Sequence, residues 1–360
     1  MAQKPETAAA PDGGDPGNAG APDQPEPTLG TLAQIAAMAG VHPSTASRVL
    51  RQSEPARGWS AAALRVLEAA EQLGYRSNLL AAGLRNRRTR TIGLVLPRLQ
   101  DYVVAALCQA IESTARLGGY HVLLTTPPDD MTAQMDSVEL LLSRRVDGII
   151  MTGLHREESV FEERLAALPV PVVAANRRDG AALASVACDD LEGGRLATEH
   201  LLSLGHERIG IVAGPRHAAS AWDRLTGYRE ALAAHDLAAD ESLVVHTQFD
   251  VGGGVLGGHT LLSLAEPPTA IFAVNDTAAV GVMAAAYQRG LHVPDDLSLV
   301  GFNDIPLSAH LPIPLTSVRS DLGQMGALAV HELLRAIDGG EARSQTLPVA
   351  LVVRSTTKAR

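Results

Sequence analysis

Two hydrophobic patterns divide the chain near residue 90. Between residues 31 and 73, apolar positions recur at the three- and four-residue spacing of helices. From residue 91 onward, short aliphatic runs alternate with helical periods. Strands that alternate with helices indicate parallel sheets covered on both faces. The patterns therefore predict a small all-α unit followed by a larger α/β body.

The first part of the small unit has the size and spacing of a helix-turn-helix. Thr31 is a suitable N-cap because its hydroxyl can accept an unpaired amide hydrogen, and Ile35 and Ala39 lie on one apolar face. Gly40 follows where a tight turn needs a positive φ, and Pro43 suits the first position of a second helix. DNA-reading domains use this arrangement, although an ordinary helical hairpin shares it. A third helix is predicted after it, over residues 61–73.

The third helix should begin at a serine and pack by three apolar side chains. Ser60 is its expected N-cap, and Leu64, Leu67 and Ala70 form its expected apolar face. Gly74 is expected to end it, as glycine often does at a helix C-terminus.

Two segments are expected to lack stable structure of their own. Residues 1–30 are rich in Pro, Ala, Gly and Asp and have almost no large apolar side chain, which is typical of a disordered tail. Residues 78–84 suit a turn or two of helix, fewer than the ~12–15 residues that an isolated helix needs. Together with the basic run 85–90, they form a predicted hinge helix and linker, 78–90. We expect residues 78–84 to fold only when two copies of the chain meet on DNA.

The body contains two series of strands and helices, and each series predicts one lobe. In open parallel sheets, ligands bind at the carboxyl ends of the strands, so we expect a ligand in the cleft between the lobes. The predicted strands are 92–96, 121–125, 146–151 and 170–175, then 209–213, 243–247, 270–274 and 298–301. The predicted helices are 105–117 and 131–143, then 193–204, 224–234, 255–264 and 278–290.

Charge is distributed unevenly along the chain, whose net charge is −10. Residues 31–90 hold nine Arg against three Glu, whereas residues 91–360 hold 20 basic and 32 acidic residues, and residues 1–30 hold one Lys against five acids. A basic unit can neutralise DNA phosphates while an acidic body is kept away from the duplex. The asymmetry favours a DNA-binding regulator.

Several classes of protein are disfavoured. No run approaches the ~20 apolar residues of a membrane span, and no secretory signal is present. The two cysteines, Cys108 and Cys188, fit a reducing cytoplasm. The glycine run 252–258 lacks dinucleotide-binding spacing, no Gly-x-Ser-x-Gly motif occurs, and the 12 histidines suggest no metal cluster. We therefore expect no enzyme activity, cofactor or metal. A free sugar-binding protein is an alternative, but it would need a signal and would not carry the basic unit.

Five motifs, taken in order and spacing, resemble the lactose-repressor (LacI/GalR) family of transcriptional regulators over residues 31–360. They are Glu-Gln-Leu-Gly-Tyr (71–75), Arg-Arg-Val-Asp-Gly-Ile-Ile (144–150), Leu-Gly-His-Glu-Arg-Ile (204–209), Asp-Leu-Ser-Leu-Val-Gly-Phe (296–302) and Leu-Pro-Val-Ala-Leu-Val-Val-Arg-Ser-Thr (347–356). The resemblance implies a helix-turn-helix domain over 31–77 and a body like periplasmic sugar-binding proteins, with crossings near 187–189, 316–320 and 344–346. It implies an N-terminal lobe of 91–187 and 321–343, and a C-terminal lobe of 188–320 and 344–360.

The resemblance also implies which residues meet DNA. The second helix would lie in the major groove, where Arg48 can pair with guanine, although a phosphate contact is the alternative. The hinge would enter the minor groove with Leu84 as a wedge, unless the hinge leucines pack against the body. His42 and Pro43 depart from the family pattern, and the lengthened loop 51–59 has no predictable contacts. The implied base-reading residues are Pro43, Ser44 and Arg48, and the implied phosphate contacts are Thr45, Ser47 and Ser60.

The same resemblance implies an effector site. Planar Arg, Asn and Asp groups suit paired sugar hydroxyls and aromatic faces suit the sugar ring, although Trp222 and Phe249 could equally be core residues. Val103, Val104 and Asn303 depart from the residues that many relatives carry, so the ligand can lie differently or be other than a common hexose. The implied effector residues are Asp101, Val104, Ser220, Trp222, Arg224, Phe249, Asn275 and Asn303.

These features predict a cytoplasmic transcriptional repressor that binds a palindromic double-stranded operator as a homodimer. A sugar or related metabolite would close the lobes and change the affinity for DNA allosterically. No leucine heptads follow the last strand, which favours a dimer over a tetramer. The alternative is a regulator of the same fold whose body has lost small-molecule binding and responds to a protein partner.

Overall fold

The computed structural model describes residues 30–50, 58–75, 88–156, 159–177 and 182–360. The chain divides into two compact units, residues 1–81 and 82–360. Within the described residues, no helix is long and apolar enough to cross a membrane. The expected tail (1–30, except Gly30), most of the hinge with Leu84, and most of the loop 51–59 lie outside the described residues.

The first unit contains the three predicted helices, α1 (Leu32–Ala39), α2 (Pro43–Val49) and α3 (Ala61–Gln72). The Thr31 side chain accepts a hydrogen bond from the Gln34 amide while the Gln34 side chain accepts one from the Thr31 amide, which is a full capping box. Gly40 adopts φ 63°, as the turn requires. These features of the helix-turn-helix prediction are confirmed.

The expected apolar face of α3 is wrong at one position. Leu64 is 53% exposed, whereas Ala63 and Val66 are buried against α1 and α2. The buried face consists of Ala63, Val66, Ala69 and Ala70, and Leu64 lies outside it. Leu67 and Ala70 do pack in this core, as predicted.

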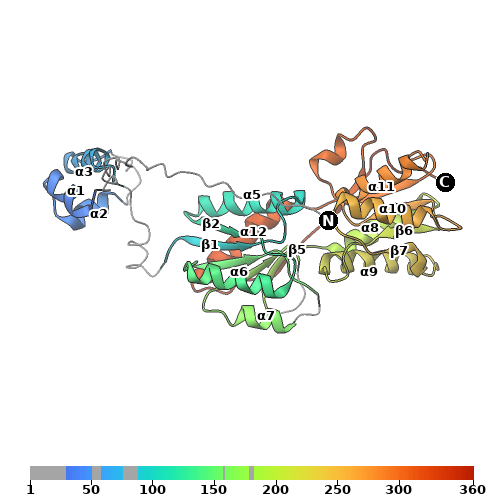
Figure 1. Ribbon diagram of the computed structural model, residues 1–360, viewed down its shortest axis with the longest axis horizontal. Coiled ribbons are helices and arrows are strands. Elements are labelled where there is room, and N and C mark those ends of the chain that lie inside the picture. Colours follow the sequence, from blue (N-terminus) through green and yellow to red (C-terminus); the bar gives the residue numbers. More distant parts are fainter. Residues whose placement is uncertain (1–29, 51–57, 76–87, 157–158, 178–181) are drawn as a thin grey trace, which may run out of the picture. The chain divides into compact units, whose positions relative to one another are not determined.

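The first lobe of the body is a six-stranded, all-parallel sheet in the order β11-β5-β4-β3-β1-β2. Helices α5 and α12 pack on one face, and α6 and α7 pack on the other (Figure 1). The strands are β1 (Thr91–Val95), β2 (His121–Thr125), β3 (Gly148–Met151), β4 (Val172–Ala175), β5 (Ala184–Cys188) and β11 (Gln345–Leu347). The helices are α5 (Tyr102–Leu117), α6 (Met131–Ser143), α7 (Ser159–Ala166) and α12 (Leu322–Ile337).

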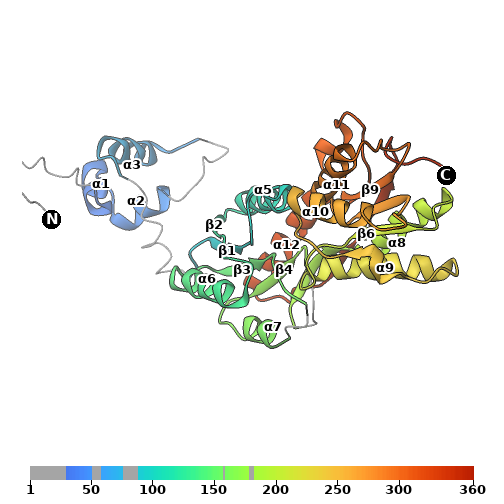
Figure 2. The ribbon, with the colours of Figure 1, turned by 45° about the vertical axis from the view of Figure 1, so that its right-hand side comes forward.

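The second lobe repeats this plan in the order β12-β10-β9-β8-β6-β7, with only β12 antiparallel. Helices α8 and α9 pack on one face and α10 and α11 on the other (Figure 2). The strands are β6 (Ile209–Val212), β7 (Val244–Val245), β8 (Ala270–Ala273), β9 (Ser298–Asn303), β10 (Thr316–Arg319) and β12 (Ala350–Val352). The helices are α8 (Asp190–Ser203), α9 (Ala219–Ala234), α10 (Val251–Leu262) and α11 (Asp276–Gln288), with 3₁₀ turns η1 (Glu241–Leu243) and η2 (Pro306–Ala309).

Two expectations for the body need correction. Residue 344 was the expected start of the last C-terminal-lobe segment, but β11 pairs with β5 and therefore belongs to the first sheet, so the chain changes sheets between β11 and β12. The helix expected over 255–264 begins earlier and ends earlier, as α10 (Val251–Leu262), so the whole glycine run 252–258 lies inside it. Its glycines are tolerated because several of them face neighbouring elements at very short range.

Glycines also set the spacing of both helix pairs in the second lobe. A Cβ added at Gly194 on α8 would lie 2.2 Å from the Arg224 carbonyl oxygen, and one added at Gly227 on α9 would lie 2.0 Å from that of Leu191. On the opposite face, Gly254 and Gly281 bring α10 and α11 equally close. The backbones of paired helices therefore touch, and any side chain at these positions would force them apart.

Candidate functional site

The first candidate surface is the solvent-facing side of α2. Pro43, Ser44 and Arg48 are exposed, and Thr45 is half-buried. Ser44 and Arg48 are four residues apart, so they share one helix face. A short helix with an exposed arginine and small polar neighbours at its N-terminal end can approach base edges in a major groove.

His42, which departs from the family pattern, is the N-cap of α2. Its Nδ1 lies 3.3 Å from the Ser44 amide nitrogen and 2.7 Å from Ser44 Oγ. The imidazole thus satisfies an amide that the helix leaves unpaired and also fixes the Ser44 hydroxyl. Capping of α2 therefore explains a histidine at this position, and the sequence analysis did not suggest that role.

Two expected phosphate-contacting serines differ in their exposure. Ser60 is exposed, and its Oγ accepts a hydrogen bond from the Ala63 amide as the N-cap of α3. Ser47 is only 8% exposed, because its position on α2 turns toward the helical core beside Ala46. Ser47 therefore offers little surface to a phosphate, and we correct that expectation.

The second candidate site is a cleft between the two lobes of the body. The free space inside it is about 30 Å³, enough for one or two water molecules. It lies where the strands of both sheets end, as expected for parallel sheets. Seven of the eight expected effector residues line it. The lining residues are Pro97, Asp101, Val103, Val104, Thr152, Asn176, Arg177, Ser220, Arg224, Phe249, Asn275 and Asn303.

Trp222 is the expected effector residue that does not line this cleft. Its ring lies on α9 beneath the Arg156 guanidinium, whose carbon is 3.9 Å from the ring centre. Because Arg156 follows β3 of the first lobe, this cation–π contact joins the two lobes outside the cleft. The neighbouring Ser220 does face the cleft, since the two residues lie on different sides of the helix.

The second lobe holds its polar cleft residues firmly. Arg224 is 4% exposed, donates from Nε to Asp190 Oδ1 at 2.8 Å and also donates to the Val274 carbonyl. Asn275 caps α11 by accepting from the Ala278 amide at 2.7 Å, and its Nδ2 donates to the Phe249 carbonyl at 2.9 Å. These bonds fix the side-chain orientations before any ligand is bound.

The first lobe contributes an arginine that the sequence reading missed. Arg177 is 6% exposed, and its Nη1 has no hydrogen-bond partner among the described residues. Burial lowers the pKa of the Arg177 guanidinium, and the charges of Asp129 and Asp101 oppose that shift. Its place directly after β4 was the available signal, because strand ends face the cleft. The cleft therefore combines two buried guanidinium groups, amides and an aromatic ring, which suits a small polar ligand.

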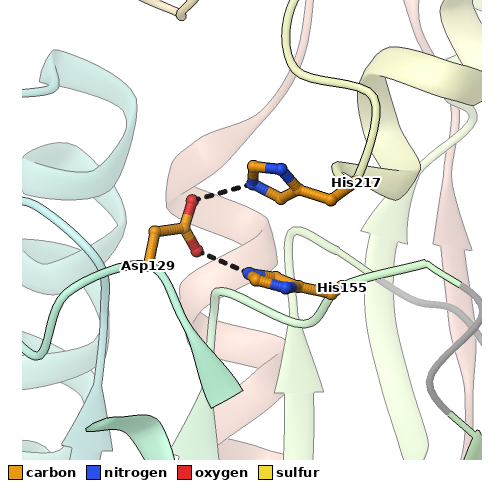
Figure 3. Close-up of side chains that lie close together, drawn as sticks. All are labelled: Asp129, His155 and His217. Atoms are coloured by element: carbon orange, nitrogen blue, oxygen red, sulfur yellow. Dashed lines mark hydrogen bonds and ion pairs between the residues drawn. The ribbon is translucent and has the colours of Figure 1, made fainter. Parts of the chain in front are cut away.

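A carboxylate and two histidines lie together where the lobes meet, although the sequence suggested no such cluster (Figure 3). His155 Nε2 lies 2.8 Å from Asp129 Oδ1, and His217 Nε2 lies 3.1 Å from Asp129 Oδ2. Burial by itself would raise the pKa of the Asp129 carboxyl, but the His155 hydrogen bond, the Arg177 charge and the His217 hydrogen bond together hold it below its ordinary value. Each of the three residues follows a strand end, which was the signal in the sequence.

Backbone contacts reinforce this junction. The Arg156 amide donates to the His217 carbonyl at 2.8 Å, and His155 forms an antiparallel bridge with Ala218. We call residues 129, 155–156 and 217–218 the inter-lobe clasp. Its contacts join the two lobes beside the cleft.

Characterised proteins resemble this chain over most of its length. The family model of a periplasmic binding protein-like domain matches residues 198–357. The chain is 32% identical to the ribose operon repressor of Haemophilus influenzae, covering 89% of this chain and 95% of that protein. It is also 32% identical to the transcriptional regulator DegA of Bacillus subtilis, covering 91% and 98%.

Solved structures give the same result. The lac repressor dimer bound to operator and the anti-inducer ONPF matches with a TM-score of 0.84 at 29% identity, covering 92% of this chain and all of that one. The complex of the transcriptional regulator CelR with cellobiose matches with a TM-score of 0.69 at 30% identity, covering 91% and 99%.

A helix-turn-helix unit joined in one chain to a two-lobed α/β body with a polar cleft defines a DNA-binding transcriptional regulator controlled by a small molecule. The chain belongs to the LacI/GalR family of transcriptional regulators.

Proposed function

We propose that this protein is a cytoplasmic repressor that binds a palindromic operator as a homodimer and is controlled by a sugar or related metabolite between its lobes. The observation that carries the proposal is the convergence of seven expected effector residues on one cleft. The lac repressor complex, a dimer on its operator, supports the dimeric mode. A two-fold symmetric dimer matches a palindromic site.

Operator reading is assigned to the exposed face of α2. Pro43, Ser44 and Arg48 would meet base edges, with Arg48 forming a paired contact to guanine. Thr45 and Ser60 would contact phosphates, which position the protein without reading sequence. The hydrogen bond that the Ser44 hydroxyl donates to His42 Nδ1 supports a fixed orientation for this hydroxyl at the groove.

The effector is assigned to the chemistry of the cleft. Arg177, Arg224 and Asn275 offer donors and acceptors at fixed angles, and Phe249 offers an apolar ring face. Polyhydroxylated rings match this combination. The cellobiose complex of CelR and the ribose operon repressor support a carbohydrate.

Control of DNA binding follows from the narrowness of the cleft. The free space of about 30 Å³ is little for a sugar ring, so we expect the lobes or the lining side chains to move apart when a ligand binds. A ligand that binds one lobe arrangement better than another shifts their populations, and operator affinity shifts with them if the two arrangements bind DNA unequally.

The narrow cleft also favours a second candidate, a body that no longer binds a small molecule and responds to a protein partner. The two candidates differ in a direct measurement. Thermal unfolding of the full chain would be recorded with a panel of pentoses, hexoses, disaccharides and nucleosides. Stabilisation by one compound supports effector binding, whereas no shift with any of them favours the protein partner.

Operator reading is tested with Arg48→Ala. After selecting an operator from random duplexes, binding is titrated by fluorescence anisotropy on matched and scrambled sequences at fixed salt. We expect a loss of about 1–3 kcal/mol on the operator and little change on the scrambled duplex. Arg116→Ala, at an exposed arginine of α5, is the matched control and should change neither. Equal losses on both duplexes would reassign Arg48 to phosphate.

The effector site is tested with Phe249→Leu, which keeps an apolar side chain in the core but removes the ring face. We expect the stabilising compound to bind at least tenfold more weakly, with operator affinity nearly unchanged. Tyr287→Leu, at a ring that is 83% exposed on α11, serves as control. Unaltered ligand binding by Phe249→Leu would make this ring purely structural.

A further inference from the structure

The inter-lobe clasp brings together three side chains of the kinds that bind metal ions, Asp129, His155 and His217. Two imidazole nitrogens and a carboxylate lie with one donor atom from each residue within 4.8 Å of the others, and the two rings are tilted by 42° with centres 4.4 Å apart (Figure 3). His155 is 8% exposed and His217 is 39% exposed. The cluster is therefore sheltered on one side and open to solvent on the other.

Imidazole nitrogens with a carboxylate oxygen are the ligands of first-row divalent metals, and Zn²⁺ in particular binds three protein ligands plus a solvent molecule. Donor atoms at the usual ~2.0–2.2 Å from Zn²⁺ are roughly 3.3–3.6 Å apart at the corners of a tetrahedron. His155 Nε2 lies 2.8 Å from Asp129 Oδ1 and His217 Nε2 lies 3.1 Å from Asp129 Oδ2, and one ligand atom of each residue lies within 4.8 Å of the others. A metal ion would replace these two hydrogen bonds, and modest rotations of the three side chains would bring one oxygen and both nitrogens to the tetrahedral spacing.

We propose that Asp129, His155 and His217 form a binding site for a divalent transition-metal ion, best matched by Zn²⁺, that links the two lobes of the body. In the metal-bound state Oδ1 of Asp129 would be the metal ligand, and His217 would turn from Oδ2 to the metal, which leaves Oδ2 to the Arg177 guanidinium, whose Nη1 is 3.7 Å away. A cation that pairs with the second carboxylate oxygen orients the ligand, as partners in the outer shell of metal sites do.

The position of the site gives metal binding a consequence for lobe arrangement. Asp129 and His155 belong to the first lobe, whereas His217 follows β6 of the second. Three ligands meet only when the clasp is closed, so the metal binds this arrangement more tightly than an open one. Metal ions therefore stabilise the closed arrangement by mass action. This inference concerns the metal alone and does not depend on the identity of the effector.

Binding is tested with the full chain, stripped of metal by a chelator and titrated calorimetrically with ZnCl₂. We expect one tight site per chain that His217→Ala and Asp129→Asn weaken by more than the ~10–100-fold typical of losing an outer-shell partner. His310→Ala, at an exposed histidine after η2, is the matched control and should bind as the native chain does. Titration with Co²⁺ should give a visible absorption band in the native chain that both clasp variants lose.

The effect on the lobes is tested with Trp222 as reporter. The chain has two tryptophans, so Trp59→Phe leaves Trp222, whose ring meets Arg156 across the lobe junction, as the single emitter. We expect ZnCl₂ to change its emission in this background and not when His217→Ala is added. His217 is partly exposed in a loop, so this variant should fold, which its unfolding curve without metal verifies.

Two results would overturn the proposal. Absence of Zn²⁺ binding by the native chain, or equal binding by the native chain and His217→Ala, would leave the cluster as a hydrogen-bonded clasp without a metal. Neither result would bear on operator or effector binding, which are measured separately.

Discussion

The two walls of the cleft are built differently, although the two lobes share one topology. On the second-lobe wall, Arg224 and Asn275 have their polar atoms engaged by the protein itself. On the first-lobe wall, Arg177 is equally buried, but its Nη1 has no hydrogen-bond partner among the described residues and lies 3.7 Å from the Asp129 carboxylate. The second lobe thus presents a preorganised surface, and the first lobe presents a charge whose pairing is incomplete.

Helix packing explains why the second-lobe wall is rigid. Gly194 brings α8 against the backbone of Arg224 itself, at a distance of 2.2 Å from an added Cβ to the carbonyl oxygen. In the first lobe, the corresponding approach of α12 to α5 at Gly326 is looser, with 2.7 Å to the Ala110 side chain. Because α8 contacts the backbone of Arg224, helix packing in the second lobe directly fixes the position of this cleft residue.

Removing the arginine from each wall should give the largest difference in unfolding free energy between the two lobes. Arg224→Ala leaves the buried Asp190 without its cation and should cost about 3–5 kcal/mol of unfolding free energy. Arg177→Met should cost less than about 1 kcal/mol, because Asp129 is partly exposed and keeps both histidine hydrogen bonds. Urea unfolding followed by Trp222 emission, in the Trp59→Phe background, measures both. Equal costs would mean that the walls do not differ in preorganisation.

Helix spacing is the next test. Gly227→Ala should cost about 3 kcal/mol or more, because the new Cβ would lie 2.0 Å from the Leu191 carbonyl oxygen and 2.7 Å from the Arg195 nitrogen. Gly323→Ala on α12 of the first lobe is the matched control. Its Cβ would meet nothing closer than 3.4 Å, and we expect a gain of about 0.5 kcal/mol. The same urea measurement applies, and a mild effect at Gly227 would show that α8 and α9 can separate easily.

The periodicity of apolar residues predicted most of the fold, because the buried positions recur at the spacing of the strand or helix that carries them. Both series of strands and helices are confirmed, with shifts of a few residues at their ends. The expected strand 243–247 is largely reduced to β7 because a 3₁₀ turn takes its first residue. The predictions for Leu64 and Ser47 were wrong because burial there depends on how the helix is rotated about its axis. Residue spacing alone does not show which side of a helix its neighbours cover.

The site was predicted less evenly. The resemblance to a family predicts site residues from matching positions, and Arg224 and Asn275, predicted in this way, do line the cleft. It did not point to the clasp residues Asp129, His155 and His217, which belong to none of the motifs that carry the resemblance. These three are far apart in sequence, and only the shared edge of parallel strands brings them together.

The smallest expected effect concerns a buried carboxylate of the second lobe. Asp276 accepts hydrogen bonds from Ser317 and Ser308 and from the Ile305 amide, yet burial raises its pKa to about 6. The folded chain therefore holds this proton more tightly than the unfolded chain, whose carboxyl has its ordinary pKa near 3.8. The resulting stabilisation is fully present below pH ~4 and is lost as pH rises through about 6.

Asp276→Asn removes this titration and so isolates it. Between pH 4 and 7, the unfolding free energy of the native chain should fall relative to that of the variant by on the order of 2 kcal/mol. Urea unfolding at half-unit pH intervals measures the difference, and groups common to both proteins cancel. A difference that is flat or rises with pH would mean that the three hydrogen bonds outweigh burial. The second lobe would then hold Asp276 in its charged form, as it holds Arg224.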